Sequence, residues 1–242
     1  MAKTVTPYND PNASKKEQVA AMFNNIAPKY DFLNQVLSLG IHKGWRRKAI
    51  RMLAAEKPRT ILDIATGTGD FAIEAMKLDP EKVVGVDISE GMLKLGVEKV
   101  NKLGLSHKIE LKPGDSENLA FPDNSFDAVT VGFGVRNFEN LEKGISDIYR
   151  VLNKNGTLVV LEFSKPRAFP IKQLYKFYSR FITPTVGKLF SKDNAAYTYL
   201  PESVNAFPDG EDFLRVLQKA GFTSTKAQTV AFGIASIYFA KK

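Results

Sequence analysis

The sequence contains no cysteine and only two histidines among its 242 residues. The lack of cysteine excludes a disulfide framework, a thiolate zinc site, a thiol nucleophile and a CxxC redox pair, and we expect no metal site. No apolar run approaches the roughly 18 to 20 residues that a membrane-spanning helix needs, and the first residues lack the apolar stretch of a signal peptide. We therefore expect a soluble, cytoplasmic protein. Its 44% apolar content suffices for a single globular domain over residues 1–242.

Acidic residues are scarce in both flanks of the chain, whose net charge is +8. Residues 1–57 hold ten Lys and Arg against four Asp and Glu, residues 58–164 hold 12 against 17, and residues 165–242 hold 12 against five. The middle is therefore acidic and both flanks are basic. Basic flanks predict attraction to a polyanion, either nucleic acid or the anionic face of a membrane.

Five short apolar runs, rich in Val and Ile, alternate with helical patterns in the middle of the chain. Continuous apolar character is typical of parallel strands that are covered on both faces. The predicted strands are Thr60–Thr66, Val83–Ile88, Lys108–Lys112, Phe126–Phe133 and Thr157–Phe163. The predicted helices between them are Asp70–Leu78, Ser89–Leu103 and Asn140–Leu152. The pattern predicts an α/β, Rossmann-like fold with a mostly parallel, doubly wound sheet.

The C-terminal part, residues 201–242, continues this fold. The helix predicted over Asp212–Ala220 is stopped by a glycine and followed by two strands, 223–231 and Ile234–Ala240. We expect these strands to form a closing hairpin that adds an antiparallel strand to the sheet.

Two portions stand outside the alternation of strands and helices. Residues 14–56 predict an N-terminal helical cap, interrupted near Pro28 and again around Gly40 to Gly44. Residues 165–200 form a long insertion after the fifth strand, which we interpret as a helical lid. Such additions commonly cover the carboxyl ends of the strands, so we expect both to lie over the ligand site of the cofactor-binding core, residues 57–164.

Polar residues follow three consecutive predicted strands. The glycine-rich turn Gly67–Gly69 follows the first strand and permits a tight turn and close approach of a ligand. Asp87 ends the second strand, where a carboxylate can accept hydrogen bonds from both ribose hydroxyls of an adenosine. Asp115 and Ser116 follow the third strand at the same edge. Together they predict a site for a nucleoside-type cofactor.

Asp63, four residues before Gly67, helps to choose the cofactor. The turn also fits the GxGxxA form of a dinucleotide fingerprint, which leaves an NAD(P)-dependent oxidoreductase as an alternative. Asp63, however, stands where a carboxylate can position the cationic amino-acid end of S-adenosylmethionine, and it would repel a pyrophosphate. In these residues the sequence resembles class I S-adenosylmethionine-dependent methyltransferases, although Ala65 stands where their motif usually has its first glycine.

The chemical group that receives the methyl must be inferred from other segments of the sequence. No Asp/Asn-Pro-Pro-Tyr motif follows the fourth strand, which argues against methylation of an amide or an exocyclic amine, and the lack of cysteine excludes a thiolate-dependent cytosine C5 mechanism. The segments Tyr30–Trp45, Gly134–Asn137 and Arg150–Ser164 resemble, closely and in order, the two signature segments and the GxRN stretch of the ubiquinone/menaquinone biosynthesis C-methyltransferase family. This resemblance covers nearly the whole chain.

The resemblance implies methylation of a ring carbon of a polyprenylated quinol. The expected reaction converts demethylmenaquinol to menaquinol, or performs the equivalent 2-methoxy-6-polyprenyl-1,4-benzoquinol step towards ubiquinol. A quinone ring is electrophilic, so it must be reduced before loss of a hydroquinone proton can make the attacking carbon electron rich. We expect Arg136 and Asn137 to hold the quinol oxygen or an ordered water, and His42 to accept a proton.

The resemblance also implies which residues bind the ligands. Carried over by position, four residues would bind the cofactor, namely Thr68, Asp87, Asp115 and Ser116, although Gly132 replaces a serine that contacts the cofactor in some members. The full set expected to contact S-adenosylmethionine is Asp63, Gly67, Thr68, Gly69, Asp87, Ile88, Asp115 and Ser116. The set expected to contact the quinol is Tyr30, Trp45, Phe133 and Tyr178.

The insertion over residues 165–200 is both basic and aromatic, with seven Lys and Arg, one acid and eight Phe and Tyr. Its apolar residues fall at helical spacing, namely Ile171, Leu174, Tyr175, Tyr178, Phe181 and Ile182. The pattern predicts a helix in a membrane interface or a lid over an apolar tunnel, and packing on the domain's own core is the alternative. We expect transient, peripheral contact with the inner face of the membrane and no nucleic-acid partner, and a homodimer is left open. Basic residues among aromatics also suit RNA, so an RNA methyltransferase is a further alternative.

Overall fold

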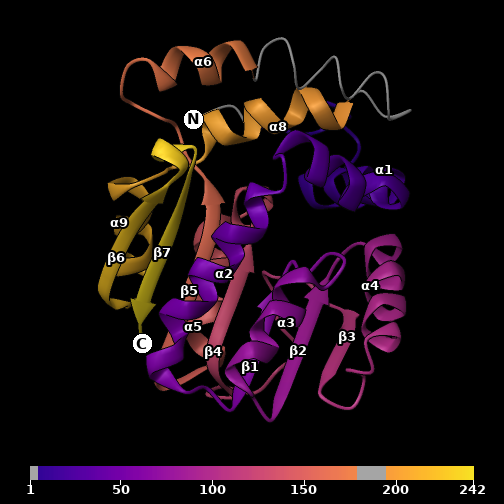
Figure 1. The fold of residues 1–242 in the computed structure, drawn as a ribbon, viewed down its shortest axis with the longest axis vertical. Coiled ribbons are helices and arrows are strands. Elements are labelled where there is room, and N and C mark those ends of the chain that lie inside the picture. Colours follow the sequence, from indigo (N-terminus) through magenta and orange to yellow (C-terminus); the bar gives the residue numbers. More distant parts are fainter. Residues whose placement is uncertain (1–4, 179–194) are drawn as a thin grey trace.

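A computed structural model describes residues 5–178 and 195–242 of the chain. Its centre is a seven-stranded sheet with the order β3-β2-β1-β4-β5-β7-β6 (Figure 1). The five neighbouring strands from β3 to β5 are parallel, whereas β7 runs antiparallel to both β5 and β6. The strands are β1 Thr60–Ile64, β2 Lys82–Asp87, β3 Ile109–Pro113, β4 Phe126–Gly132, β5 Leu152–Phe163, β6 Thr223–Val230 and β7 Ala235–Lys241. The predicted doubly wound sheet with a C-terminal antiparallel strand is confirmed.

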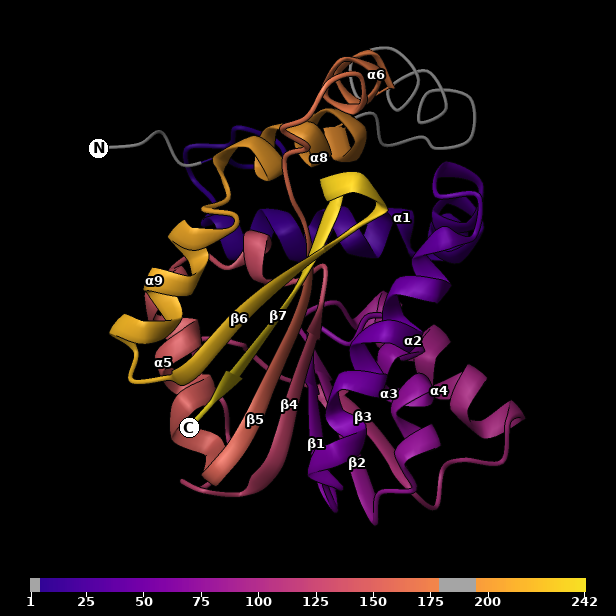
Figure 2. The ribbon, with the colours of Figure 1, turned by 60° about the vertical axis from the view of Figure 1, so that its left-hand side comes forward.

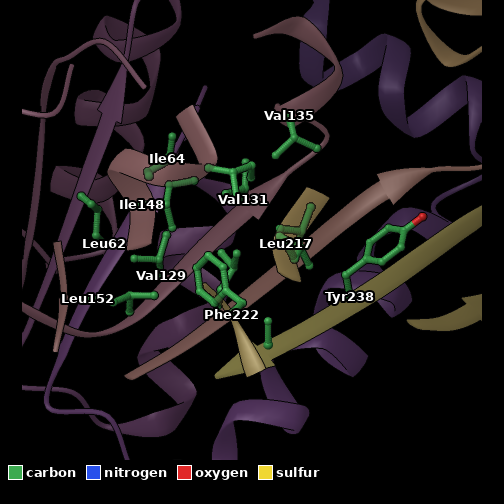
Figure 3. Packing of buried hydrophobic residues seen from close by; sticks show 14 of the residues in the cluster. Leu62, Ile64, Val129, Val131, Val135, Ile148, Leu152, Leu217, Phe222 and Tyr238 are labelled. Atoms are coloured by element: carbon green, nitrogen blue, oxygen red, sulfur yellow. The ribbon is translucent and has the colours of Figure 1, made fainter. Parts of the chain in front are cut away.

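Helices cover both faces of the sheet because successive strand residues point to opposite sides. On β1, Leu62 and Ile64 pack towards α5 (Leu141–Val151) and α9 (Glu211–Lys219) in the cluster shown in Figure 3. Ile61, one residue before Leu62, packs towards the other face. That face is covered by α2 Ile41–Leu53, α3 Asp70–Ala75 and α4 Glu90–Lys102. The predicted strands therefore read as continuous apolar runs because both of their faces are buried.

The first helix of the N-terminal cap is the long helix α1, Lys15–Leu37. Ser14 and Glu17 form a complete capping box at its start, which satisfies two of the free backbone N–H groups. The interruption predicted near Pro28 is wrong, because α1 continues through this proline. A proline inside a helix removes one hydrogen bond, and the burial of apolar residues on both sides of it offsets this loss. They are Val19, Met22, Ile26, Ala27 and Leu33, which pack with Met92 of α4 and Ala196 and Tyr199 of α8.

Three helices lie beyond the carboxyl ends of the parallel strands, as the views in Figures 1 and 2 agree. They are α1, α6 (Ile171–Phe177) and α8 (Ala195–Ala206). The helix expected from Ile171 onward is present as α6, while Phe181 and Ile182 lie outside the described residues. The division of the chain into cap, core, lid and C-terminal part stays a prediction.

Candidate active site

A cleft lies at the carboxyl ends of β1, β2, β3 and β4, roofed by α1. This edge of an open α/β sheet is where a small-molecule ligand or cofactor commonly binds. The strand tips contribute Ala65, Gly67, Asp87, Ile88, Gly114, Asp115, Ser116, Glu117, Gly132, Phe133 and Gly134. The 3-10 helix η3 (Val135–Asn137) and the residues after it contribute Asn137, Phe138 and Glu139, and α1 and α4 contribute Lys16, Val19, Phe23, Tyr30 and Met92.

The two glycines of the turn after β1 have different tasks. A Cβ on Gly67 would meet nothing within 4 Å, so its backbone is open to the cleft and a ligand can approach it closely. A Cβ on Gly69 would lie 3.1 Å from Leu111 Cδ1, so this glycine allows the turn to pack on the sheet. Ala65, the departure from the general motif, adopts φ 52°, the left-handed conformation that glycine adopts at least cost. The turn therefore keeps the shape of the motif without its first glycine.

Asp87 holds this turn from the tip of β2. Its carboxylate accepts hydrogen bonds from the backbone N–H groups of Gly67 and Ser89, each at 2.8 Å. Burial raises the pKa of Asp87 above its usual range, although these two donors act in the opposite direction. A carboxylate has about four acceptor positions, so Asp87 can hold the turn and still accept from a ligand in the cleft.

The start of α1 closes the mouth of the cleft. Lys16 Nζ lies 2.6 Å from Asp115 Oδ2, and Lys15 Nζ donates to the backbone carbonyls of Arg136 and Phe138 at 3.0 and 2.8 Å. Burial would raise the pKa of Asp115, but the hydrogen bond and the charge of Lys16 lower it below its ordinary value. Asp115 is therefore ionised at neutral pH, and Lys16 is a lining residue that the sequence reasoning missed.

Three residues expected to bind the cofactor do not line the cleft. Asp63 is fully buried beneath it and accepts hydrogen bonds from Thr66 Oγ1 and Thr130 Oγ1 at 2.6 and 2.7 Å. Burial raises the pKa of Asp63 to about 6. Thr68 is 3% exposed and donates to Asp31 Oδ1, and Gly69 faces the sheet. Among the described residues, the structure therefore gives Asp63 and Thr68 partners within the protein that fix the shape of the turn.

A network of charges joins this turn to four helices. Lys99 of α4 donates to Asp31 of α1 at 2.6 Å, to Thr68 Oγ1 at 3.0 Å and to Asp70 of α3 at 2.8 Å. Arg46 of α2 pairs with the other oxygen of Asp70 at 2.8 Å. The sequence reasoning assigned no role to Lys99, because its three partners are 29 to 68 residues away along the chain.

We expect a Lys99→Met substitution to weaken binding of S-adenosylmethionine about fivefold, since partly exposed ion pairs contribute up to about 1 kcal/mol. The turn would lose its anchor, while no group that faces the cleft is removed. Calorimetric titration with the cofactor measures the effect, and Lys94→Met, at an exposed position of the same helix, is the matched control. Equal affinities of the two variants would contradict a role of the network in the cofactor site.

Arg136 and Asn137 lie in η3, just after the tip of β4, the strand next to β1 in the sheet. Asn137 lines the cleft, and its Oδ1 accepts a hydrogen bond from Tyr199 Oη of α8 at 3.1 Å. Arg136 lies just behind the wall with its side chain 8% exposed, paired at 2.8 Å with Glu162, whose side chain is 0% exposed. Arg136 Nε has no hydrogen-bond partner among the described residues. The guanidinium therefore places a buried positive charge beside the cleft.

Glu162 and Tyr199 are site residues to which the sequence reasoning gave no role. Glu162 also accepts from the backbone N–H groups of Arg136 and Phe163, at 3.3 and 2.8 Å, so it fixes the position of the Arg136 side chain. Burial raises the pKa of Glu162 while the charge of Arg136 lowers it. One signal was available for Glu162, because it is a single charged residue in an otherwise apolar predicted strand. No local signal in the sequence connects Tyr199 with Asn137.

The residues expected to contact substrate are partly assembled at the cleft. Tyr30 and Phe133 line it, and Trp45 packs against Phe133 with 6.3 Å between ring centroids. Phe133 also packs on Phe163 at 4.6 Å, so these rings continue the cleft as an aromatic wall. Tyr178 is not among the residues that line the cleft, and its hydroxyl donates to the carbonyl of Leu37 at 2.6 Å.

His42 does not line the cleft. It is 7% exposed and hydrogen-bonds to Ser38 Oγ, four residues earlier in the chain. Burial, together with the charge of Arg46, lowers the pKa of His42 from 6.5 to about 4. At neutral pH the ring is therefore uncharged, and its role as a proton acceptor stays a prediction.

The pKa of His42 predicts how stability depends on pH. The unfolded chain binds a proton near pH 6.5 and the folded chain only near pH 4, so this histidine lowers the free energy of unfolding as the pH falls through that interval. A His42→Gln variant should lose less stability than the parent protein between about pH 7 and about pH 4.5. Urea unfolding of both proteins at several pH values tests this, and a difference that stays constant with pH would contradict it.

Comparison with known proteins gives a consistent result over the full length. The model of the ubiE/COQ5 methyltransferase family matches residues 12–242. The chain is 52% identical over 239 residues to a demethylmenaquinone methyltransferase of Bacteroides fragilis, covering 98% of this chain and 97% of that protein. It is 43% identical over 230 residues to the ubiquinone/menaquinone biosynthesis C-methyltransferase UbiE of Geobacter sulfurreducens, covering 94% of this chain and 90% of the relative.

Solved structures support the fold. An S-adenosylmethionine-dependent methyltransferase from Thermotoga maritima matches with a TM-score of 0.64 at 21% identity, covering 92% of this chain and 99% of the other. The cyclase SpnF matches with a TM-score of 0.66 at 20% identity, covering 96% and 98%. Since a methyltransferase and a cyclase share this architecture, the fold alone does not decide the reaction.

Proposed function

The chain belongs to the ubiE/COQ5 methyltransferase family, and from this premise we propose that it transfers a methyl group from S-adenosylmethionine to a ring carbon of demethylmenaquinol, giving menaquinol. The observation that carries the proposal is the composition of one cleft. Asp87 and Asp115, which suit an adenosine, line the same cleft as Asn137 and Phe133, which suit a quinol ring. The relatives named demethylmenaquinone methyltransferase support the choice of substrate.

The residues at the strand tips fit S-adenosylmethionine, which is the cofactor of this enzyme class. Asp87 can accept from the ribose, Gly67 leaves its backbone open to the ligand, and Asp115 and Ser116 line the end of the cleft next to Lys16. When bound, the cofactor supplies an electrophilic methyl group on a positively charged sulfur. The protein's own task is to hold the ring carbon in line with that methyl group and to exclude water.

The wall formed by η3 suits the chemistry of the quinol. The ring carbon becomes nucleophilic as a hydroquinone oxygen loses its proton, so a phenolate-like charge develops on that oxygen. The buried guanidinium of Arg136 lies beside the cleft and would stabilise this charge, while Asn137 would hydrogen-bond the oxygen. The new carbon–carbon bond forms as the methyl–sulfur bond breaks, and the sulfur keeps the bonding electron pair as a neutral thioether. The ring carbon then loses its proton to water, which restores the aromatic hydroquinone.

A second substrate has its own support. The Geobacter sulfurreducens relative is named for both ubiquinone and menaquinone biosynthesis. The equivalent 2-methoxy-6-polyprenyl-1,4-benzoquinol step is therefore included in the proposal. Both quinols present a hydroquinone oxygen next to the carbon that is methylated, so the same wall would serve both.

The polyprenyl tail suggests where the protein works. No helix in the described residues is long and apolar enough to cross a membrane. We propose a cytoplasmic protein that meets its quinol by transient, peripheral contact with the inner face of the membrane, through the basic and aromatic residues 165–200. A homodimer is compatible with this proposal and is not required by it.

The test is transfer of labelled methyl from S-adenosylmethionine to demethylmenaquinone in liposomes, with and without a reductant. We expect transfer only in the reduced sample, because the oxidised ring is electrophilic. Calorimetry with S-adenosylmethionine and with NADH separates this proposal from an oxidoreductase. Cofactor binding without transfer to either quinol, together with labelling of RNA, would replace it by an RNA methyltransferase.

A further inference from the structure

Large apolar side chains are exposed at the end of the molecule that lies beyond the carboxyl ends of the parallel strands. Five of them define what we call the docking face: Leu39 (83% exposed), Ile41 (53%), Phe169 (81%), Leu174 (61%) and Phe232 (81%). They come from three separate segments. These are the elbow from the end of α1 to the first residue of α2, α6 with the residues that lead into it, and the turn η5 (Ala231–Gly233) between β6 and β7. Single exposed apolar residues are ordinary, but a group of them marks an interaction surface.

Hydrogen bonds hold these three segments next to one another. The hydroxyl of Tyr178, at the end of α6, donates to the carbonyl of Leu37, at the end of α1, at 2.6 Å. Ser164 donates through Oγ to the carbonyl of Gly233 and through its backbone N–H to that of Ile234, at 2.8 and 2.9 Å. The α6 segment is thereby joined to the elbow on one side and to the turn on the other. Figures 1 and 2 place all three at the same end of the molecule.

The backbone conformation of Phe232 is an independent indication that the docking face binds a partner. Its φ is 56°, in the left-handed region that a bulky side chain rarely adopts and that turns normally fill with Gly or Asn. The residue thus combines an unfavourable backbone conformation with an exposed aromatic ring. Neither is explained by packing within the fold, and strained exposed positions cluster at binding sites.

Charge indicates the chemistry of the partner. Residues 32–48 and residues 164–178 each contain four Lys or Arg and neither contains an Asp or Glu. Lys43, Arg167 and Lys172 are exposed among the apolar side chains of the docking face. Of these basic residues, Lys165 pairs with Asp209 and Arg46 with Asp70. Exposed apolar and aromatic side chains accompanied by exposed cations suit the surface of an anionic lipid bilayer, where rings enter the interface and cations meet the headgroups.

The docking face is also close to the cleft. Tyr30 lines the cleft, and α1 continues from it for seven residues to Leu37, a distance of about 10 Å along the helix axis. A ligand dissolved in the bilayer would therefore have a short path from the lipid surface to the aromatic wall.

We infer that Leu39, Ile41, Phe169, Leu174 and Phe232 form one bilayer-docking surface built from three segments, two of which lie outside residues 165–200. The purpose of docking, delivery of a quinol, rests on the proposed function, whereas the docking itself does not. Hydrogen bonds hold the elbow and the η5 turn in place, so the surface is preformed and seats the protein with the cleft next to the lipid.

Sedimentation with vesicles tests the docking. The full chain is mixed with vesicles of phosphatidylcholine alone, or of phosphatidylcholine and phosphatidylglycerol, at low and high salt. We expect binding to the anionic vesicles that weakens with salt, and a loss of at least about tenfold in affinity for Leu39→Ser/Phe232→Ser, since each side chain gives up interfacial burial. Arg167→Gln/Lys172→Gln should weaken binding at low salt and flatten its salt dependence.

The control lies at the other end of the molecule. Leu103, at the end of α4, is 53% exposed, as is Ile41, and Leu103→Ser should bind vesicles within about twofold of the parent protein. Leu39→Ser/Phe232→Ser binding the anionic vesicles as tightly as the parent would overturn the inference. So would a concentration-dependent dimer that this double variant abolishes, because the face would then belong to a second copy of the chain.

Activity separates this inference from the proposed function. With a water-soluble, short-tailed quinol, the double variant should keep the parent kcat, whereas with a long-tailed quinol in vesicles its rate should fall in proportion to its binding. Methyl transfer to neither quinol, with vesicle binding intact, would refute the proposed function and leave the docking surface in place. Transfer from vesicles at the parent rate by a double variant that no longer binds them would refute the delivery role.

Discussion

An Arg136→Met variant is expected to lose about 3 to 5 kcal/mol of unfolding free energy together with at least about a hundredfold in methyl transfer. The large stability effect follows from Glu162, which is 0% exposed and would become a buried carboxylate without its counter-charge. The loss of activity follows because a positive charge beside the cleft would disappear. Urea unfolding and labelled-methyl transfer measure the two effects.

A double variant separates these effects. In Arg136→Met/Glu162→Gln, the amide oxygen of the neutral glutamine can accept from one of the two backbone N–H groups, of residues 136 and 163, that the two carboxylate oxygens now satisfy. We expect the double variant to recover most of the lost stability, since replacing both members of a buried ion pair is far less costly than removing one. It should remain inactive. Recovery of activity along with stability would mean that Arg136 serves the fold and not the reaction.

An Asp87→Ala variant is expected to weaken binding of S-adenosylmethionine by about 1.5 to 3 kcal/mol, or roughly 10- to 150-fold. The structure gives two reasons for a large effect. The ribose would lose its acceptor, and the N–H groups of Gly67 and Ser89 would lose theirs, which would loosen the turn as well. Calorimetric titration with the cofactor and with its demethylated product measures the loss.

Asp87→Asn divides the two contributions. The amide oxygen can continue to accept from one backbone N–H group, but the NH₂ group cannot accept from the second or from the ribose. We expect an affinity between those of the parent protein and of Asp87→Ala. Affinity equal to the parent for either variant would place the adenosine elsewhere in the cleft.

The sequence predicted the sheet well because the determinants of its strands are local. Val83–Ile88 and Phe126–Phe133 are continuous apolar runs between helical patterns, and such runs predict covered parallel strands whatever lies around them. The edge at which ligands bind also follows from chain direction alone. For this reason Gly67, Asp87, Ile88, Asp115 and Ser116 were placed at one cleft before any contact was known.

The remaining features depend on contacts between distant segments. Thr68 and Asp63 carry residue types that suit a ligand, but their oxygens are used by Asp31 in α1 and by Thr130 in β4, 37 and 67 residues away. Lys16 reaches the cleft only because α1 folds back over the strand tips. The spacing of residue types along the chain contains no information on hydrogen bonds and ion pairs between distant segments.

His42 shows a different limit. Its residue type and an ordinary pKa near 6.5 suggest proton transfer at neutral pH. Burial in the elbow between α1 and α2 changes that pKa, and burial of one side chain depends on how complete helices pack. The interruption predicted near Pro28 is wrong for a similar reason. The packing of α1 on α4 and α8 outweighs the tendency of a proline to break a helix.

The roof of the cleft has a consequence for the order in which the protein is made. Lys15, at the start of α1, hydrogen-bonds to the carbonyl of Arg136, 121 residues later in the chain. At a synthesis rate of about 5 to 20 residues per second, the ribosome needs roughly 6 to 24 seconds to supply that partner. During this interval the apolar side of α1 has been synthesised but the wall it closes against has not. Helix α1 is therefore synthesised first but reaches its final position late. A nascent chain cannot enclose its cofactor until most of the sheet has been translated.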